Sequence, residues 1–456
     1  MSSKLINDER DKIIERLGTI VEENDKIDPE LYKKYNVKRG LRDLDGTGVL
    51  VGLTEIGDVR AYIFDEEEKV PTEGRLFYRG IEINDFVHGF QSEKRMGFEE
   101  CCYLLLLGEL PDSKQLMEFC DLLGELRTLP SGFTEDMILK APSKDVMNKL
   151  ARSVLAAYSY DGNPDDMSIK NTLRQCIELI ARFPTMVAYG YQAKSHYHEG
   201  KSLFIHSPKK HLSTAENFLH MIRPDSNYTA SEAEMLDLAL VLHAEHGGGN
   251  NSTFVAHVVT STGTDTYSAI AAAIGSLKGP QHGGANLKVM GMMEEIKSNV
   301  KDWDDEEEIA AYLTKIMKKE AFDRTGLIYG VGHAVYTVSD PRTILLKQKA
   351  ENLAREKGLE KEYQLYTQIE KLAPEVFSRE KKSDKVICAN VDFYSGFVYK
   401  SLNIPTELFT PIFAVGRIAG WCAHRIEELV NGGRIIRPAY KSVIGKRGYI
   451  PLDKRG

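Results

Sequence analysis

Helical periodicity dominates the chain from Phe98 onward and limits the folds that it can adopt. Long segments there place apolar residues at a spacing of 3.6 and are separated by proline, glycine and asparagine breaks. No regular alternation of strands with helices appears, so a doubly wound parallel sheet is not expected. The segment Gly46–Tyr62 mixes glycine with β-branched residues and indicates a short strand or hairpin. We therefore predict a mainly α fold with a small β-hairpin near the N-terminus.

A charged stretch in the second half of the chain indicates a second domain. It covers residues 283–395 and contains the acidic run Asp302–Glu308 and the basic cluster Arg379–Lys385. We predict a large helical domain made of residues 1–282 and 396–456, with residues 283–395 as a smaller domain inserted into it.

Size and composition are typical of a globular protein with a sizeable core. The 456 residues are 42% hydrophobic and 28% charged, and the net charge of −8 argues against nucleic-acid binding through a broadly basic surface. No apolar run is long enough to span a bilayer, and the charged N-terminal segment resembles neither a secretory nor a transit peptide. The six cysteines form no CxxC pair and no disulfide-framework spacing, so we expect a cytoplasmic protein without membrane or nucleic-acid partners.

Capping signals mark the ends of three helices that flank the chemically interesting segments. One helix is predicted to open at Ser231, with Glu234 three residues later as in a capping box. A second, alanine-rich helix should stop at Gly279–Pro280. A third should begin with Thr410 as its N-cap and Pro411 in its first turn.

His243 and His246 lie three residues apart at the end of the first of these helices. The spacing would allow metal binding, but the segment is not HExxH and lacks completing cysteines or paired acids. One histidine could instead cap the helix C-terminus, where positive charge is favourable. A third interpretation is a ligand site in which His246 and Asn250 offer hydrogen bonds, and the three intervening glycines let backbone approach closely.

Two further histidines and an aspartate lie in glycine-rich or turn-like segments: His282 in GPQHGGAN, His333 in YGVGHAVYTVSDPR and Asp392 in NVDFYSG. A helix expected near Asn286 would keep His282 neutral through its dipole, and a neutral imidazole can donate to a carbonyl oxygen. A turn histidine satisfied by backbone is the alternative. Asp392 would be a general base if burial raises its pKa, or else the cap of an Asx-turn.

Arg417 is anomalous because it shares an apolar helical face with Phe413 and Trp421. A buried arginine needs an anion, although snorkelling to the surface is an alternative. Arg342 and Arg437 offer two more guanidinium groups, which suit bidentate carboxylate binding. The three arginines and two histidines predict a pocket for a small dicarboxylate.

These segments resemble those of the citrate synthase family. LHAEHGGGNNS, GPQHGGAN, GVGHAVYTVSDPR and NVDFYSG occur in the same order as in that family, and the similarity runs from about Gly40, through EGRLFYRG at Glu73–Gly80, to IIRPAYKS near the end. Four ordered motifs over roughly 400 residues are far more specific than any one of them alone. The resemblance implies a nearly all-helical homodimer whose small domain closes over the substrates.

The resemblance also implies roles for individual residues. The oxaloacetate site would comprise His246, Asn250, His333, Arg342 and Arg417, with Arg437 lent by one subunit to its neighbour's site. Asp392 would remove a methyl proton from acetyl-CoA, and His282 would hold the resulting enol or enolate. His333 would polarise the oxaloacetate carbonyl, and citryl-CoA would then be hydrolysed to citrate and CoA.

For the coenzyme, the backbone of the loop Tyr329, Gly330, Val331 and Gly332 resembles the segment that meets the adenine. Arg79 and Lys385 match basic positions near the CoA phosphates, whereas Thr337 stands where some members of the family carry a basic residue. Acetyl-CoA is a substrate and arginines bind the oxaloacetate dianion, so the resemblance implies neither a cofactor nor a metal.

Three alternatives compete with citrate synthesis. 2-Methylcitrate synthase uses propionyl-CoA with the same catalytic set, and one methylene is worth only about 1–3 kcal/mol in a pocket. A non-enzymatic helical scaffold could bind a carboxylate with Asp392 in a structural role. A metallohydrolase would use His243 and His246 as ligands.

Overall fold

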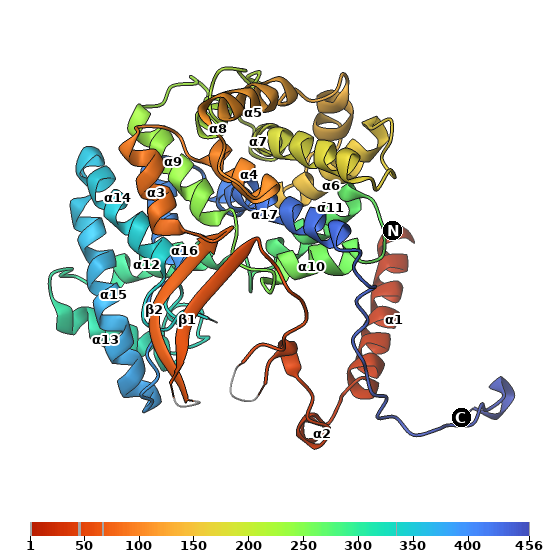
Figure 1. Cartoon of the computed structure of the whole chain (residues 1–456). Coiled ribbons are helices and arrows are strands. Elements are labelled where there is room, and N and C mark those ends of the chain that lie inside the picture. Colours follow the sequence, from red (N-terminus) through yellow and green to blue (C-terminus); the bar gives the residue numbers. More distant parts are fainter. Residues whose placement is uncertain (1, 44–46, 66–67, 334, 456) are drawn as a thin grey trace. The chain divides into compact units, whose positions relative to one another are not determined.

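The chain divides into two compact units, Met1–Leu53 and Thr54–Gly456, each of which is described by itself. The structure, a computed structural model, describes residues 2–43, 47–65, 68–333 and 335–455. The first unit contains α1 (Ser2–Asn24), α2 (Pro29–Lys34) and a 3-10 turn at Arg39–Leu41 (Figure 1). Asp28 caps α2, because its carboxylate accepts a hydrogen bond from the backbone N–H of Glu30 at 2.9 Å.

A three-stranded antiparallel sheet opens the second unit. Its strands are β1 (Gly57–Asp65), β2 (Glu68–Tyr78) and β3 (Ile81–Glu82), in the order β1-β2-β3 (Figure 1). Gly57 pairs with Tyr78, and the buried Tyr78 hydroxyl donates to the carbonyl oxygen of Val241 at 2.9 Å. The sheet is thereby tied to the helical core at the end of β2.

The predicted hairpin exists, but the prediction misplaced it along the chain. Its first strand begins at Gly57 rather than at Gly46, which lies outside the described residues. Leu50 and Leu53, within the predicted segment, are 84% and 90% exposed, whereas Leu76 in β2 is buried. Strand formation follows burial against neighbours more closely than it follows β-branched content.

The rest of the second unit is helical, which confirms the mainly α fold. The α-helices are α3 (Ile83–Ser92), α4 (Phe98–Leu107), α5 (Ser113–Leu126), α6 (Val146–Ala157), α7 (Ile169–Glu199), α8 (Thr214–Ile222), α9 (Ala230–His243), α10 (Asn251–Thr260), α11 (Thr266–Lys278), α12 (Ala285–Asn299), α13 (Glu306–Met317), α14 (Pro341–Lys357), α15 (Glu360–Lys381), α16 (Val391–Ser401) and α17 (Phe409–Val430). Short turns are π-helical at Thr134–Leu139 and 3-10 at Tyr158–Tyr160, Thr406–Leu408 and Leu452–Lys454.

Helix α17 is the centre of the core. It packs against α4, α7, α9, α10 and α11, and Figure 1 shows it among these helices. Every residue from Phe409 to Arg425 is buried, including Arg417, His424 and Arg425. Three titratable side chains are therefore enclosed by the most apolar part of the fold, where each requires an internal partner or a ligand.

A second group of helices, α12 to α16, packs together through α12–α16, α13–α15 and α14–α16 contacts. These elements correspond to most of the predicted smaller domain at residues 283–395. The boundary at residue 395 would cut through α16, whereas the boundary at residue 282 falls in the turn before α12. The division into a large and a small domain remains a prediction.

Both predicted helix starts are wrong by two residues. Thr229, not Ser231, caps α9, and Glu232 completes its capping box. The pattern T-x-x-E at 229–232 and the pattern S-x-x-E at 231–234 are equivalent in sequence, so only the fold selects between them. The hydroxyl of Ser231 instead donates to Glu356 at 2.8 Å.

The second predicted start, at Thr410, is displaced by a short preceding turn. Helix α17 begins at Phe409, and Thr410 lies inside it with its hydroxyl donating to the carbonyl oxygen of Gly283 at 3.1 Å. The predicted stop of α11 is confirmed, since Gly279 is its C-cap.

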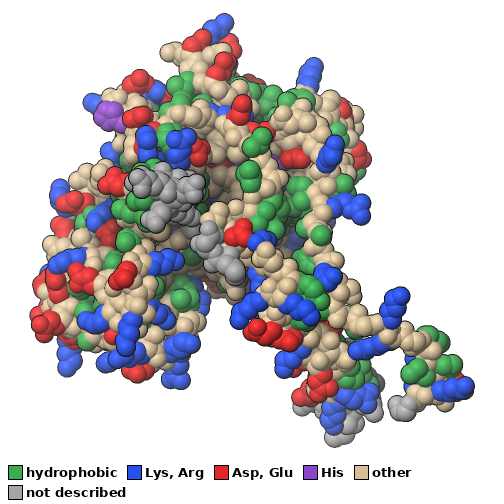
Figure 2. Space-filling view, turned by 60° about the horizontal axis from the view of Figure 1, so that its bottom comes forward, with side chains coloured by type: hydrophobic (Ala, Val, Ile, Leu, Met, Phe, Trp, Pro, Cys, Tyr) green, Lys and Arg blue, Asp and Glu red, His purple; other side chains and the backbone are tan. Residues whose placement is uncertain are grey.

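The surface carries charges of both signs. Figure 2 shows Lys and Arg side chains interspersed with Asp and Glu on this face of the molecule. Within the described part of the chain, no helix has the length and apolar character needed to cross a bilayer.

Candidate active site

The structure brings most of the predicted site residues together around a set of aromatic rings. The rings of His246 and His333 lie 5.2 Å apart, and both contact Tyr336, at 5.5 and 4.9 Å. The Arg342 guanidinium lies 5.8 Å from the Tyr336 ring. The end of α9, the glycine-rich loop 329–333 and the first turn of α14 therefore meet at one place.

Phe413 of α17 links the remaining members. The Arg417 guanidinium lies 4.8 Å from the Phe413 ring, and the ring centroids of His282 and His243 are 6.3 and 4.4 Å from it. Burial lowers the pKa of both His246 and His282, and the charge of Arg417 lowers both further, so the two groups of residues share one electrostatic environment.

Arg417 is fully buried and only partly paired. Its Nε donates to the carbonyl oxygen of His243 at 2.6 Å, but Nη1 and Nη2 have no hydrogen-bond partner. Burial lowers the pKa of the guanidinium to about 10, against the opposing effect of Glu245. A buried cation with two unpartnered NH2 groups is costly to the fold unless an anion binds there.

Other buried polar atoms at this place are also unpartnered: His246 Nε2, Tyr336 Oη and Asp392 Oδ1. Buried polar atoms are normally satisfied, so a cluster of exceptions indicates a ligand site. The combination of a guanidinium, imidazoles and a hydroxyl suits an oxygen-rich anion. The snorkelling alternative for Arg417 is therefore wrong.

Asp392 lies in the first turn of α16, where its backbone N–H donates to the Asn390 side chain at 3.0 Å. Burial raises the pKa of its carboxyl to about 6, although Arg342 acts in the opposite direction. The raised pKa agrees with the expectation for a general base. The cap of α16 is Asn390, so the alternative in which Asp392 is itself the cap is wrong.

His282 lies in the turn between α11 and α12, and its Nε2 is 3.1 Å from the hydroxyl of Ser252. Trp421 Nε1 donates to the same hydroxyl at 3.1 Å. Burial lowers the pKa of His282 to about 4, helped by the charge of Arg417, so the ring is neutral at physiological pH. Neutrality was expected, but its main cause is burial rather than the neighbouring helix dipole.

The tautomer of His333 follows from its backbone contacts. Its Nδ1 accepts the N–H groups of Val335 and Tyr336 at 3.0 and 3.1 Å. A ring nitrogen that accepts two hydrogen bonds carries no proton, so in the neutral ring the proton is on Nε2. His333 can therefore donate from Nε2 to a carbonyl oxygen.

Arg342 is held in place by Asp340, the N-cap of α14. The Asp340 carboxylate accepts hydrogen bonds from Arg342 Nε at 3.1 Å and from Nη2 at 2.8 Å. Burial lowers the pKa of Arg342, but the charge of Asp340 and these hydrogen bonds outweigh burial and raise it. Asp340 also accepts the backbone N–H of Val391 at 3.3 Å. One carboxylate thus fixes both the arginine and the start of the helix that carries Asp392.

The loop Tyr329–Gly332 is attached by its backbone to the segment before Asp392. Gly332 N–H donates to Cys388 at 2.7 Å, and Asn390 N–H donates to Gly330 at 2.9 Å. Gly330 has φ +77°, and a Cβ there would lie 2.8 Å from Phe393 and Val289. The position therefore requires glycine for both conformation and space.

Of the remaining predicted residues, Asn250 lies near this cluster, whereas Arg79, Lys385 and Arg437 are not brought to it. Arg79 Nε and Nη2 donate to the carbonyl oxygen of Leu105 at 3.2 and 3.0 Å, which caps the end of α4. Lys385 and Arg437 are exposed, the latter in the extended segment after α17. Asn250, just before α10, accepts from the Ser252 hydroxyl at 2.9 Å and so lies next to the partner of His282.

His243 does not form a metal site with His246. Its Nε2 lies 2.9 Å from the Tyr399 hydroxyl in the core. In the described part of the chain, no group of three or more His, Cys, Asp and Glu side chains is arranged to hold a metal ion.

Sequence reasoning missed three residues of the site: Tyr336, Asp340 and Ser252. Asp340 could have been found from the sequence, because D-P-R is an N-cap signature with proline in the first turn. Ser252 follows Asn250 directly in the motif, but its contact with His282 depends on tertiary packing.

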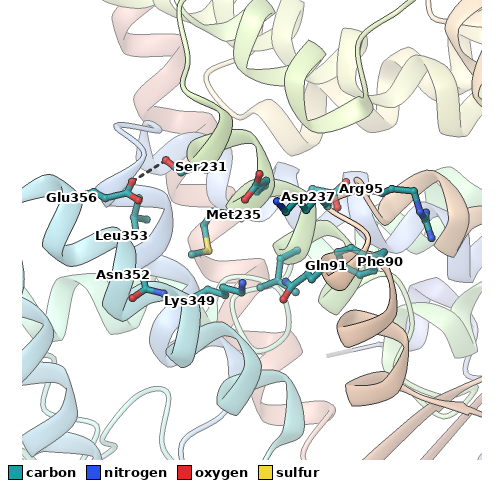
Figure 3. Close-up of a pocket in the computed structure, with 13 residues that line it drawn as sticks. Phe90, Gln91, Arg95, Ser231, Met235, Asp237, Lys349, Asn352, Leu353 and Glu356 are labelled. Atoms are coloured by element: carbon teal, nitrogen blue, oxygen red, sulfur yellow. Dashed lines mark hydrogen bonds between the residues drawn. The ribbon is translucent and has the colours of Figure 1, made fainter.

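A separate cavity of about 360 Å³ lies between α3, α9 and α14 (Figure 3). Its walls carry Lys94, Arg95, Lys349, Glu234 and Glu356, and Figure 3 shows the Ser231–Glu356 hydrogen bond on one side. None of the predicted site residues lines it. The chemistry of the histidine and arginine cluster lies elsewhere.

Comparison with known proteins identifies the family. A family model described as citrate synthase, C-terminal domain, matches residues 43–439. The chain belongs to the citrate synthase family. It is therefore an enzyme of the acyltransferase type, and the non-enzymatic scaffold is excluded.

Individual relatives agree with this assignment. A citrate synthase of Synechocystis is 36% identical over 84% of this chain and 89% of its own length. A 2-methylcitrate synthase of Shewanella oneidensis is 33% identical over 83% of this chain and 92% of its own. The citrate synthase of Thermoplasma acidophilum, solved as a ternary complex with carboxymethyl coenzyme A and oxaloacetate, superposes with a TM-score of 0.73 at 26% identity, covering 92% of this chain and 99% of that one.

Because Nη1 and Nη2 of Arg417 lack partners, we expect opposite effects on stability for two substitutions on α17. Arg417→Met removes a buried charge with idle donors, so the free energy of unfolding should rise by about 1–4 kcal/mol while binding of the dicarboxylate is lost. Arg425, equally buried, is the matched control because its guanidinium donates to Thr260, Thr266 and the carbonyl oxygen of Thr264.

Arg425→Met should lower the free energy of unfolding by about 1–3 kcal/mol, since it leaves buried acceptors unsatisfied. Urea denaturation and isothermal titration with oxaloacetate measure both effects. A destabilised Arg417→Met protein would mean that Arg417 is a structural residue.

Proposed function

We propose that this enzyme is a citrate synthase, which condenses acetyl-CoA with oxaloacetate and hydrolyses the product to citrate and CoA. The observation that carries the proposal is the fully buried Arg417, whose Nη1 and Nη2 lack partners beside neutral histidines and a carboxyl with raised pKa. An anionic ketone and an enolising thioester together would use all of these groups.

Oxaloacetate would be held by charge and by hydrogen bonds. Arg417 and Arg342 would bind its carboxylates, with His246 and Asn250 as further donors. His333 would donate from Nε2 to the ketone oxygen, because its Nδ1 is occupied by two backbone N–H groups. Arginines neutralise the dianion, so the proposal requires no metal and no cofactor.

The thioester would react through its enol or enolate. Asp392 would take a proton from the methyl group, and the neutral His282 would stabilise the charge that develops on the thioester oxygen. The new carbon–carbon bond forms between the methyl carbon and the ketone carbon, and the ketone oxygen is protonated. Water then cleaves the thioester and releases CoA as the thiol.

The coenzyme would lie along the loop Tyr329–Gly332. The ternary complex named for the Thermoplasma relative contains a coenzyme A derivative and oxaloacetate, which supports the same pair of ligands here. Lys385, which is exposed, would reach a phosphate. Arg79 is the weaker candidate, because its guanidinium is engaged by Leu105, and Thr337 offers no charge.

A 2-methylcitrate synthase is the second candidate, because relatives of that activity align over most of the chain. The deciding measurement is kcat/KM for acetyl-CoA and for propionyl-CoA with saturating oxaloacetate. We expect acetyl-CoA to be preferred, and a difference of one methylene should amount to about 10- to 200-fold. Preference for propionyl-CoA would reject the citrate assignment in favour of the second candidate.

The role of Asp392 predicts both a variant phenotype and a pH dependence. Asp392→Asn should retain the fold and oxaloacetate binding but lower kcat by about 100- to 10,000-fold. A base must be deprotonated, so activity should fall as pH drops below the pKa of about 6. Steady-state rates between pH 5 and 8 test this, and unchanged turnover in Asp392→Asn would remove Asp392 as the base.

We also propose a homodimer in which Arg437 completes the partner's site. In support, Arg437 is exposed on an extended segment, and the preceding Ile436 N–H donates to Ser261 at 3.0 Å, at the end of α10. Mixing inactive Arg437→Ala and Asp392→Asn subunits should then restore up to about a quarter of the activity, because one site in four carries both intact residues in a random mixture. Mixed species verified by mass spectrometry without any recovery would contradict the shared site.

The protein is proposed to act in the cytoplasm, without nucleic-acid or membrane partners. All six cysteines are free thiols, which agrees with a reducing compartment.

A further inference from the structure

A chain of four titratable side chains connects the core below the His246–Asn250 loop with the surface. Glu245 Oε1 lies 3.0 Å from His424 Nε2, His424 Nδ1 lies 3.2 Å from His257 Nε2, and His257 Nδ1 lies 2.9 Å from Glu428 Oε2. The side chains of Glu245 and His424 are 0% exposed, and those of His257 and Glu428 are 14% and 17% exposed. None of the steps proposed for the reaction uses these residues.

The geometry fixes the number of protons on the two imidazoles. Each terminal link pairs a ring nitrogen with a carboxylate, and an ionised carboxylate only accepts, so both of those nitrogens must carry a proton. The central link joins two ring nitrogens and has room for one proton. Three protons on four nitrogens correspond to one imidazolium and one neutral imidazole.

The surroundings of His257 disfavour a charge on that ring. Burial and the charge of His424 lower the pKa of His257, against the opposing effect of Glu428. The other charged groups that face the pair are Glu245 from the segment after α9 and Glu427 of α17, whose carboxylate is 3.8 Å from His424 Nδ1. A second proton in the central link would place N–H groups on both His257 Nε2 and His424 Nδ1, facing each other. Loss of the shared proton would instead leave two lone pairs facing each other on these nitrogens.

Glu245 transmits the state of this chain to the loop. Its Oε1 also accepts the backbone N–H of Gly247, next to His246. A Cβ at Gly57 would come within 2.7 Å of the carboxylate, and one at Gly420 within 2.4 Å, so Glu245 has no room to move. A Cβ at Gly248 would lie 3.5 Å from both His257 and His424, which places the loop backbone directly on the pair.

No metal is needed to hold this cluster, since the described residues include no group of three or more ligating side chains arranged for one. We propose that Glu245, His424, His257 and Glu428 form a positioning chain that holds the loop 246–250 through one shared proton, so that its protonation controls how tightly the loop binds its ligand. That this ligand is oxaloacetate rests on the proposed function.

The first experiment compares KM for oxaloacetate and kcat between pH 5.5 and 9 in the wild type, His257→Gln and Glu428→Gln. An amide keeps hydrogen-bonding capacity but does not titrate in this range. We expect His257→Gln to raise KM at neutral pH by about fivefold or more with little change in kcat, and to flatten its pH dependence. In the wild type, loss of the shared proton at high pH should loosen the loop and raise KM. Glu428→Gln should keep the contact but shift this rise in KM to lower pH, because the imidazolium loses a nearby negative charge.

His220→Gln is the matched control. His220 is also partly buried, has a lowered pKa and lies 3.2 Å from the backbone oxygen of Ser207. It lies on α8 and does not belong to the four linked side chains. Its KM profile should coincide with that of the wild type. A uniform rise in KM at every pH in His257→Gln, without any shift in Glu428→Gln, would overturn the shared-proton chain and leave only a packing role.

A second readout does not depend on catalysis. A histidine whose pKa is lowered in the folded state resists a proton that the unfolded chain accepts near its ordinary value of about 6.5. His257 therefore makes the free energy of unfolding fall as pH drops through that range, and this fall should be shallower in His257→Gln. Urea denaturation at pH 5.5, 6.5 and 7.5 measures it. An equally steep fall would overturn the proposal, whatever substrate the enzyme uses.

Discussion

The burial of a charged arginine at the centre of α17 is the constraint on which the site depends. The fold surrounds Arg417 with aromatic and apolar side chains, satisfies one of its donor groups through the carbonyl oxygen of His243, and leaves two idle. The same burial keeps His282 neutral and raises the pKa of Asp392. A candidate anion site, a neutral imidazole and a carboxyl with a raised pKa therefore arise from one cause, the exclusion of water around α17.

The proposed catalytic groups are organised by residues that contact each other rather than by independent loops. Asp340 orients Arg342 and holds the backbone at the start of α16, so a change at that carboxylate would disturb both the proposed anion site and the proposed base. Effects of substitutions at such shared partners are not expected to add. The chain from Glu245 to Glu428 extends the same principle to the loop that carries His246.

Local patterns in the sequence predict the fold class and single out several residues that the structure brings together. Helical periodicity predicts the α-helical class, and glycine-flanked histidines and an arginine in an apolar stripe single out His246, His333 and Arg417. The contacts of Ser252, Tyr336 and His424 could not be predicted, since they join segments far apart in the chain. The prediction of the cap of α9 was wrong for a different reason. Two equivalent capping patterns overlap at Thr229 and Ser231, and only packing distinguishes them.

The backbone bridge between Val331 and Ala389 joins the loop proposed to hold the coenzyme to the segment that carries the proposed base, Asp392. A substitution made in the loop to change how the coenzyme is held would therefore also shift the carboxylate proposed as the base. Coenzyme affinity and turnover would change together in such variants, although the two groups lie in different segments of the chain.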